Sequence, residues 1–283
     1  MSLFLEVKIT DGLGNQLFQY ATGRSLAIKK GIRNLLLNTD SFKYNTLGRA
    51  FGLRNFKTKG TVITNKTVER ILRKGTRSNQ LVSAFPFYKV ISDDGRLLPD
   101  LSREDALFIC LEGYWQSEYY FRNIRAQLLD EIQPVATPDL PDWIQQRETV
   151  AVHVRRGDYL VESAIGCLGS SYYERAMDIM RERLNNPLFV FFSDDIPWCK
   201  QTFSGESAFF CEQAPWDKDY LQLYLMSQCR HQIVANSSFS WWGAWLNQNP
   251  GKIIVRAQNP FADATLYHKP NYYPDDWIGV NNG

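Results

Sequence analysis

The sequence predicts an α/β fold in which two Rossmann-like domains face each other across a cleft, and three observations predict it. Residues 4–27 combine a strand pattern, a turn with two glycines and a helix pattern. Strand and helix patterns alternate again over residues 150–255, which is typical of a parallel sheet wound by right-handed crossovers. Three prolines between Gln133 and Pro141 mark a stiff connector. We expect an N-terminal domain over residues 1–138 and a C-terminal domain over residues 139–283, whose last residues could pack back on the first.

Composition limits the classes of protein to which the chain can belong. Its 283 residues are 44% hydrophobic, enough for a substantial core, and its formal charge of +2 does not favour nucleic acid as a partner. No apolar run approaches the roughly 18 residues of a membrane span, and the first residues carry charge too early for a secretion signal. The five cysteines lack a Cys-x-x-Cys pair and indicate reduced thiols in a cytoplasmic protein. His153, His231 and His268 lack the spacing of metal ligands, so we expect no metal site.

The first half opens with a βαβ pattern. Residues 4–9 alternate like a strand, a glycine turn and a helix pattern follow, and a second strand is expected near residues 35–38. Such a turn presents backbone N–H groups to a phosphate or a sugar. The glycines also fit a simple tight turn, but Asn15 and Gln16 at its mouth favour binding.

The next stretch is basic and has little periodicity. Residues 24–77 contain fourteen Lys or Arg against two acids. This is either a solvated face or a surface that meets an acidic acceptor or anionic lipid headgroups, which would place the protein peripherally at the inner face of a membrane. Over residues 39–80 we expect loops and short helices.

A strand expected over residues 106–111 leads to an aromatic pair. Tyr114 and Trp115 are either core residues or a platform for a sugar ring. Ser117 could cap a helix that runs to about Leu129.

The second half has a regular pattern. Strands are expected over residues 150–154, 188–192, 208–211, 232–235 and 252–255. Helices are expected from Ser171, over residues 217–229, and over the Trp-rich stretch that begins at Phe239. Ser171 and Glu174 have the spacing of a capping box.

Polar side chains follow three of these strands at the point where each strand ends. The three sets are His153, Arg155, Arg156 and Asp158; Ser193, Asp194 and Asp195; and Asn236, Ser237 and Ser238. Each has an ordinary explanation, since exposed arginines can be solvated and the other residues can cap helices. Open parallel sheets, however, bind ligands outside the carboxyl ends of their strands. Guanidinium groups and a serine-rich helix start suit a diphosphate, and a neighbouring carboxylate suits the N–H edge of guanine or a ribose hydroxyl. The sequence therefore predicts a nucleoside diphosphate in the second half.

Five stretches resemble the α-1,2-fucosyltransferases, of the bacterial type, in glycosyltransferase family 11. They are Gly12-Leu-Gly-Asn-Gln-Leu-Phe-Gln-Tyr-Ala21, Gly113-Tyr-Trp-Gln-Ser-Glu118, His153-Val-Arg-Arg-Gly-Asp-Tyr159, Phe192-Ser-Asp-Asp195 and Asn236-Ser-Ser-Phe-Ser-Trp-Trp-Gly-Ala-Trp-Leu246. They span nearly the whole chain in order, and the last is long and rich in Trp. Residues 39–105 match none of the motifs and are expected to tune the acceptor.

The resemblance implies an activity and a set of residues. It implies a GT-B fold, GDP-β-L-fucose as donor, and inversion to an α-1,2 link on a galactose-terminated glycan, without an obligatory divalent metal or another cofactor. Related fucosyltransferases place the first arginine of the third motif on the β-phosphate, so Arg155 is the expected catalytic residue. The expected donor-binding residues are His153, Arg155, Arg156, Asp158, Asp194, Asp195, Asn236, Ser237, Ser238, Gly14 and Asn15, with Gln16, Tyr114 and Trp115 on the acceptor side.

Three questions stay open at this level. Asp217-Lys-Asp219 resembles the Asp-x-Asp metal motif of the other glycosyltransferase plan, but no apolar strand leads into it, so we expect acids in a first helical turn. The general base is unassigned among Asp158, Glu162, Asp11 and Glu112. Another nucleotide-sugar transferase and a non-catalytic glycan- or nucleotide-binding protein are the alternative functions.

Overall fold

The chain forms two compact units. The computed structural model describes residues 2–44, 48–77, 87–93, 100–205, 207–263 and 271–282. One unit comprises Met1–Gln133 with Lys269–Tyr272, and the other comprises Pro134–His268 with Tyr273–Gly283. Within the described residues, no helix is long and apolar enough to cross a membrane.

The first unit is built on a five-stranded parallel sheet of order β3-β2-β1-β5-β4. The strands are β1 (Phe4–Lys8), β2 (Asn34–Asn38), β3 (Thr61–Ile63), β4 (Tyr88–Ser92) and β5 (Phe108–Glu112). Two long helices, α1 (Leu13–Lys30) and α2 (Asn65–Arg77), cover opposite faces. Gly23 of α1 lies against Val7 and Leu35, whereas Val68 of α2 packs with Leu36 and Phe108. Shorter helical turns are η1 (Asp40–Tyr44), η2 (Leu53–Asn55), η3 (Leu101–Arg103), η4 (Glu118–Tyr120), η5 (Arg122–Ile124) and α3 (Arg125–Glu131).

Two predictions for the first unit are wrong. Strand β3 and the 13-residue helix α2 lie where loops and short helices were expected. The apolar face of α2 rests on Val68, Ile71 and Leu72, which have helical spacing but are surrounded by cations. Ser117 caps a helix as expected, but that helix is the short turn η4. The chain then passes through Phe121 in a non-helical conformation before η5 and α3.

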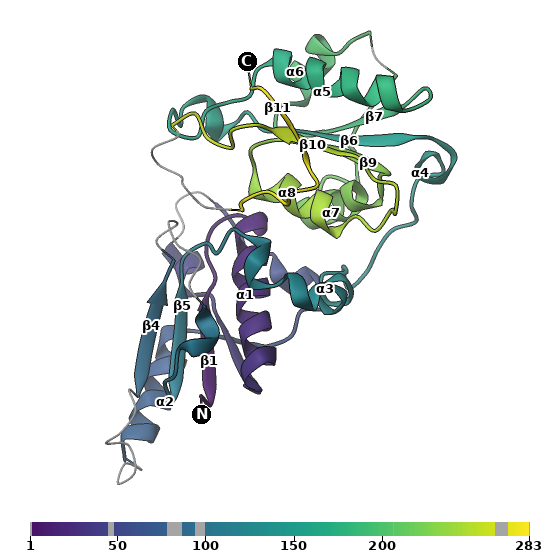
Figure 1. The fold of residues 1–283 in the computed structure, drawn as a ribbon. Helices are drawn as coiled ribbons and strands as arrows, with labels where there is room; N and C mark the ends of the chain where they lie inside the picture. The colour runs from purple at the N-terminus through teal and green to yellow at the C-terminus, as the bar shows by residue number, and fades with distance from the viewer. Residues whose placement is uncertain are drawn as a thin grey trace. The chain divides into compact units, whose positions relative to one another are not determined.

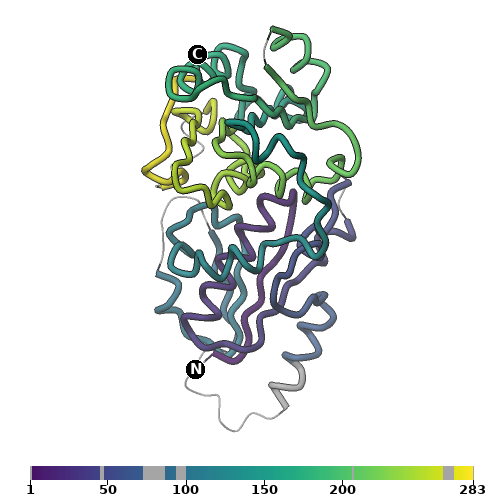
Figure 2. The backbone as a smooth tube through the Cα atoms, turned by 90° about the vertical axis from the view of Figure 1, so that its right-hand side faces the viewer, coloured from purple at the N-terminus to yellow at the C-terminus, as the bar shows by residue number. Residues whose placement is uncertain are grey.

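The second unit is a doubly wound parallel sheet of order β11-β10-β9-β6-β7-β8. The strands are β6 (Thr149–Val154), β7 (Leu188–Ser193), β8 (Ala208–Phe210), β9 (His231–Val234), β10 (Ile254–Ala257) and β11 (Ile278–Val280). The predicted strands are confirmed, and β11 is an addition of three residues that pairs with β10 near the yellow end of the tube in Figure 2. The chain moves outward from β6 to β8 and then returns to β9, the order expected of a Rossmann-like fold.

Helices cover both faces of this second sheet, as Figure 1 shows for α5 and α6 on one side and α7 and α8 on the other. The helices are α4 (Trp143–Gln146), α5 (Ser170–Arg183), α6 (Ile196–Thr202), α7 (Asp219–Gln228) and α8 (Ser238–Leu246). Val152 of β6 packs with Tyr172 and Met180 of α5, while its neighbour Ala151 packs with Leu225 of α7. Both faces are therefore buried, which explains the nearly continuous apolar strands.

The capping box predicted for α5 is wrong. Gly169 occupies the N-cap position and no side chain caps the first turn, because Ser171 already lies inside the helix.

Candidate active site

The strand order of the second unit brings the ends of β6 and β9 together at the point where the order reverses. Ligands of open parallel sheets bind in the crevice at such a point. Residues 155–158 follow β6, residues 194–195 follow its neighbour β7, and residues 236–238 follow β9. The structure thus brings the three predicted polar sets to one edge of one sheet.

Arg155 lies in this edge between two carboxylates. Its Nη2 and Nε lie 2.7 and 3.0 Å from Oδ1 of Asp158, and its Nη1 lies 3.0 Å from Oδ2 of Asp194. A guanidinium group has five N–H donors, of which these contacts use three. The side chain is 26% exposed. The carboxylates can therefore hold the group in place while its other donors face an anionic ligand.

Arg156 is more deeply placed than Arg155. Its Nε lies 3.0 Å from Oδ2 of Asp195, and its guanidinium carbon lies 4.1 Å from the ring centre of Trp198. Its side chain is 18% exposed. The backbone N–H of Arg156 donates to Oδ1 of Asp194 over 2.9 Å. Asp194 therefore bridges the two arginines.

The two aspartates differ in function. Asp195 caps α6, since its Oδ1 accepts from the backbone N–H of Trp198 over 3.1 Å. The ordinary explanation is thus confirmed for Asp195, which also binds Arg156. Asp194 fits beside Gly157 because that residue has no side chain. A Cβ at residue 157 would lie 2.6 Å from Oδ2 of Asp194. Gly157 was not among the predicted site residues, although it lies inside the motif of residues 153–159.

The end of β9 contains a helix start. Ser237 is the N-cap of α8 and its Oγ accepts from the N–H of Phe239 over 3.3 Å, so the capping explanation is confirmed for Ser237. Ser238 opens the helix and is half-buried. Asn236 is buried and donates to the carbonyl oxygen of Gly166 over 2.9 Å, whereas its Oδ1 has no hydrogen-bond partner among the described residues. A helix start with an adjacent hydroxyl favours an anion.

His153 is buried beside this edge. Its ring centre lies 5.4 Å from that of Phe239. Burial, assisted by the charge of Arg155, lowers the pKa of His153 to about 3, so the imidazole is neutral at physiological pH. Its Nδ1 has no hydrogen-bond partner within the part of the chain that the structure describes. Contact of His153 with guanine or ribose stays a prediction.

In the first unit, the loops after β1 and β5 lie side by side at the carboxyl edge of the sheet. Tyr114 donates from its hydroxyl to Oδ2 of Asp11 over 2.6 Å, and this bond together with burial raises the pKa of Tyr114 to about 12. Asp11 and Trp115 have φ angles of 63° and 55°, in the left-handed region that non-glycine residues rarely adopt. Strained backbone of this kind clusters at functional sites. Arg49, which was not among the predicted site residues, lies beside Gly12 at the same edge.

The predicted residues of the first unit fall into two groups. Tyr114 is exposed, and Asn15 accepts from Nε2 of Gln116 over 2.9 Å. Trp115, in contrast, is fully buried, which supports the core alternative for its ring and not the sugar platform. Gln16 is also fully buried, and its amide binds the backbone of loop residues 50–52, so its role here is structural. Gly14 is buried within α1.

The described part of the chain was expected to lack a metal site. No group of three or more His, Cys, Asp or Glu there could hold a metal ion. Asp219 is the first residue of α7, as expected of an acid in a first helical turn. His268 lies outside the described residues.

Comparisons with known proteins agree with this geometry. Residues 4–281 match the model of glycosyl transferase family 11. The chain is 31% identical to an alpha-1,2-colitosyltransferase of Escherichia coli over 96% of this chain and 97% of the relative. It is 31% identical to the human galactoside alpha-(1,2)-fucosyltransferase 1 over 62% of this chain and 53% of the relative. Its fold is similar to that of an Arabidopsis thaliana FUT1 variant in complex with GDP, with a TM-score of 0.56, 10% identity, and coverage of 97% of this chain and 77% of that one. The chain therefore belongs to glycosyltransferase family 11 and is a glycosyltransferase with the Rossmann-like units of the GT-B class.

Proposed function

We propose that this protein is an inverting α-1,2-fucosyltransferase that transfers L-fucose from GDP-β-L-fucose to a galactose-terminated glycan. The observation that carries the proposal is the arginine turn after β6, where Asp158 and Asp194 hold Arg155 at the reversal point of the sheet. The α-1,2 linkage is supported by the names of relatives from both bacteria and primates.

The reaction we propose is a single displacement. The acceptor hydroxyl attacks the anomeric carbon while the C–O bond to GDP breaks, so negative charge accumulates on the diphosphate. Hydrogen-bond donors that are held next to the diphosphate stabilise the transition state more than the ground state. Arg155 supplies such donors in a pre-oriented state, because two carboxylates already hold its guanidinium. Ser238 and the start of α8 supply further N–H and hydroxyl groups.

The candidates for the general base differ in what their carboxylates contact. Asp158 is bound to Arg155, and Glu112 is bound to Lys8, so each already balances a cation. Asp11 instead accepts from a neutral hydroxyl, that of Tyr114. We propose Asp11 as the base, with Glu162 as the other candidate that forms no such ion pair with a described residue: Asp11→Asn is expected to lower the rate of transfer by about 10²–10⁴ while GDP binding is unchanged. Equal transfer rates for the variant and wild type would remove Asp11 from the mechanism.

A second donor sugar is favoured by one specific observation. One relative that matches nearly the whole chain is named as a colitosyltransferase. Colitose is fucose without its 3-hydroxyl. A site built to hydrogen-bond that hydroxyl discriminates against the deoxy sugar by about 10⁴–10⁵. Parallel assays with the GDP esters of both sugars therefore decide between the two donors.

The test of the proposal uses two changes at Arg155. Arg155→Ala removes the donors and is expected to lower the transfer rate by about 10²–10³. Arg155→Lys is also expected to fail, because lysine lacks the planar fork that binds two oxygens at once. Transfer to a panel of galactose-terminated acceptors is measured with linkage analysis of the product, after circular dichroism confirms folding.

Arg181→Ala is the matched control. Arg181 lies in the same unit and, like Arg155, binds an aspartate three residues away, but on the surface of α5. Its loss is expected to leave transfer unchanged. Activity of Arg155→Ala within about threefold of Arg181→Ala would refute the role of Arg155.

A further inference from the structure

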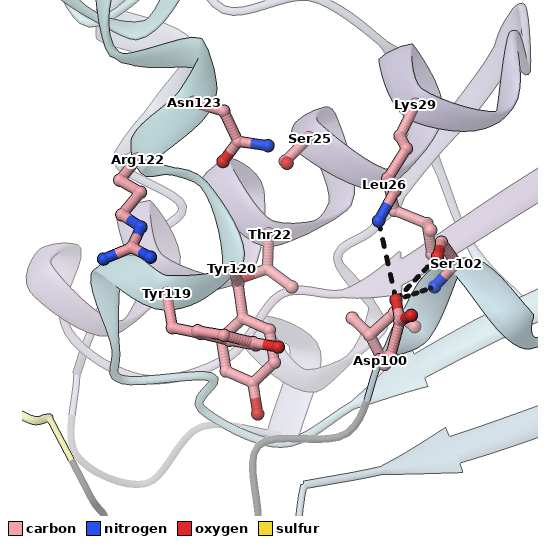
Figure 3. Close-up of a pocket in the computed structure, with 11 residues that line it drawn as sticks. Thr22, Ser25, Leu26, Lys29, Asp100, Ser102, Tyr119, Tyr120, Arg122 and Asn123 are labelled. Carbon is pink, nitrogen blue, oxygen red and sulfur yellow. Dashed lines mark hydrogen bonds and ion pairs between the residues drawn. The ribbon is translucent and has the colours of Figure 1, made fainter.

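The first unit carries a pocket of about 530 Å³ that is separate from the carboxyl edge of its sheet. The second half of α1 and the turns η3, η4 and η5 form it (Figure 3). Helix α1 starts at the carboxyl edge, directly after β1. Ser25 lies on the pocket twelve residues after the first helical residue, Leu13, which corresponds to about 18 Å along the helix. The turn η3 precedes β5 and so lies at the amino edge of the sheet.

A series of aromatic rings forms one wall of the pocket. The ring of Tyr119 meets that of Tyr120 edge-on with centres 5.6 Å apart, and Tyr120 meets the buried Trp115 edge-on at 5.4 Å. These contacts fix the orientation of Tyr119, although its side chain is 41% exposed. Leu26 and Leu101 are buried and form an apolar floor. A rigid exposed tyrosine above an apolar floor suits a ligand with one apolar face.

The rim of the pocket carries charges of both signs. Lys29 lies 3.5 Å from Oδ1 of Asp100, which also accepts from the hydroxyl of Ser102 over 2.6 Å. Arg122 and Asn123 lie across the pocket from this group, as Figure 3 shows. Arg122 forms no ion pair with another described residue.

The mixed charge selects the class of ligand. A phosphate would meet Lys29 and Arg122, but it would also meet the carboxylate of Asp100, and like charges repel. A neutral hydroxyl avoids this conflict, because it donates to a carboxylate and accepts from a guanidinium or an amide. A neutral sugar ring combines such hydroxyls with a face of C–H groups, which matches the wall and rim of the pocket.

We propose that this pocket binds a neutral sugar residue of the glycan acceptor at a distance from the galactose that reacts. The C–H face of the sugar lies on Tyr119, and its hydroxyls bind Asp100, Arg122 and Asn123. The identification of the ligand with the acceptor rests on the proposed function. Because the pocket lies along the second half of α1, with Ser25 about 18 Å from the first residue of the helix, the bound sugar is several residues along the glycan. The enzyme consequently prefers long acceptors to short ones.

Binding without donor is the first measurement. Saturation-transfer NMR with a galactose-terminated hexasaccharide as the probe is expected to show a signal from wild-type protein. Tyr119→Ala and Arg122→Ala are each expected to weaken its affinity roughly tenfold. Tyr119→Phe keeps the ring and is expected to retain binding. Arg33→Ala removes an exposed arginine that lies just after α1 and does not line the pocket, so it serves as the matched control.

Transfer is the second measurement, with lactose as the short acceptor. The pocket variants are expected to lower kcat/KM for the hexasaccharide about tenfold while kcat/KM for lactose and hydrolysis of the donor stay unchanged. Equal losses for both acceptors, or no loss for either, would overturn the proposal. If no acceptor is fucosylated by wild type, the proposed function fails, yet the NMR comparison of Tyr119→Ala with Tyr119→Phe still decides whether the pocket binds a sugar.

Discussion

The absence of a side chain at Gly157 lets Asp194 reach both arginines. Oδ1 of Asp194 accepts from the N–H of Arg156, and Oδ2 lies 3.0 Å from Nη1 of Arg155. A Cβ at residue 157 would lie 2.6 Å from that same Oδ2. The Gly157→Ala change is therefore expected to push the carboxylate away from Arg155 and to weaken GDP binding roughly tenfold, which calorimetric titration measures.

The control for this change is Gly205→Ala in the same unit. A Cβ at Gly205 would meet nothing within 4 Å. Its GDP affinity is expected to equal that of wild type. If Gly157→Ala bound GDP as tightly as Gly205→Ala, the position of Asp194 would not matter for the site.

The buried His153 is expected to make stability depend on pH. Its pKa is about 3 in the folded chain, against about 6.5 in an unfolded chain. Between these values the unfolded state binds more protons, so stability is lost as pH falls below 6.5. At pH 5 this residue alone lowers the free energy of unfolding by up to about 2 kcal/mol relative to pH 7.5.

The change His153→Gln isolates this contribution. Chemical unfolding at pH 7.5 and at pH 5 is compared for wild type and variant. Whatever the stability of the variant at either pH, its loss of stability between pH 7.5 and pH 5 is expected to be smaller than that of wild type by about 2 kcal/mol. All other titratable groups are common to both proteins, so their contributions cancel in this comparison. An identical pH dependence would show that His153 titrates normally in the folded state.

Single residues also show where the sequence could predict the site. Arg155 and Asp194 were predicted because charged residues directly after apolar strands are conspicuous. For Trp115 the sequence left a core position and a sugar platform open, because an aromatic residue that follows a strand can point inward or outward, and its full burial supports the core alternative. Gly157 and Arg49 act by proximity to residues distant in sequence, which no local pattern reveals.

Helix α1 packs so closely on β1 that Gly23, the residue of α1 at the contact, has no room for a methyl group. A Cβ at Gly23 would lie 2.3 Å from Cγ2 of the buried Val7. Alanine favours a helix by up to about 1 kcal/mol over glycine, but overpacking costs about 1–3 kcal/mol. Since Val7 is branched and enclosed, Gly23→Ala is expected to destabilise the protein by about 2 kcal/mol in urea unfolding.

A second change shows whether the contact is the cause. Val7→Ala leaves a cavity in the wild-type background, but it makes room for the new methyl group in Gly23→Ala. The double variant is therefore expected to be more stable than the sum of the single changes predicts, by at least about 0.5 kcal/mol. Strict additivity would mean that Gly23→Ala acts in some other way.

The elements themselves were predicted where burial dominates the pattern. The strands of the second unit were predicted because they are apolar on both faces. Strand β11 was missed because it has only three residues and the middle one is a glycine, and β3 because only one of its three residues is buried. The helix start at α5 was misplaced since a glycine loop, and not Ser171, sets the first turn.

At the scale of the whole molecule, the cations of the basic stretch are partly neutralised by carboxylates from outside it. Several cations of the basic stretch have carboxylate partners, among them Arg24 with Glu131 and Lys30 with Asp105. Such pairs reduce the net field that an anionic surface would meet. Peripheral contact with an anionic membrane stays a prediction.

The division into two units predicts how the protein responds to GDP. Each unit has its own sheet and core, and every residue between His153 and Ser238 that we assign to the donor lies in the second unit. A ligand that binds one unit stabilises that unit alone unless the two unfold together. Differential scanning calorimetry is expected to show two transitions. GDP at about 100 times its Kd stabilises the unit that binds it by about 2.7 kcal/mol, and a unit of this size shifts its transition temperature by about 3 °C per kcal/mol. One of the two transitions is therefore expected to rise by roughly 8 °C.

Arg155→Ala is expected to reduce that shift and to leave the other transition where it was. A shift of both transitions, or of the first unit alone, would place the nucleotide elsewhere than at the arginine turn after β6.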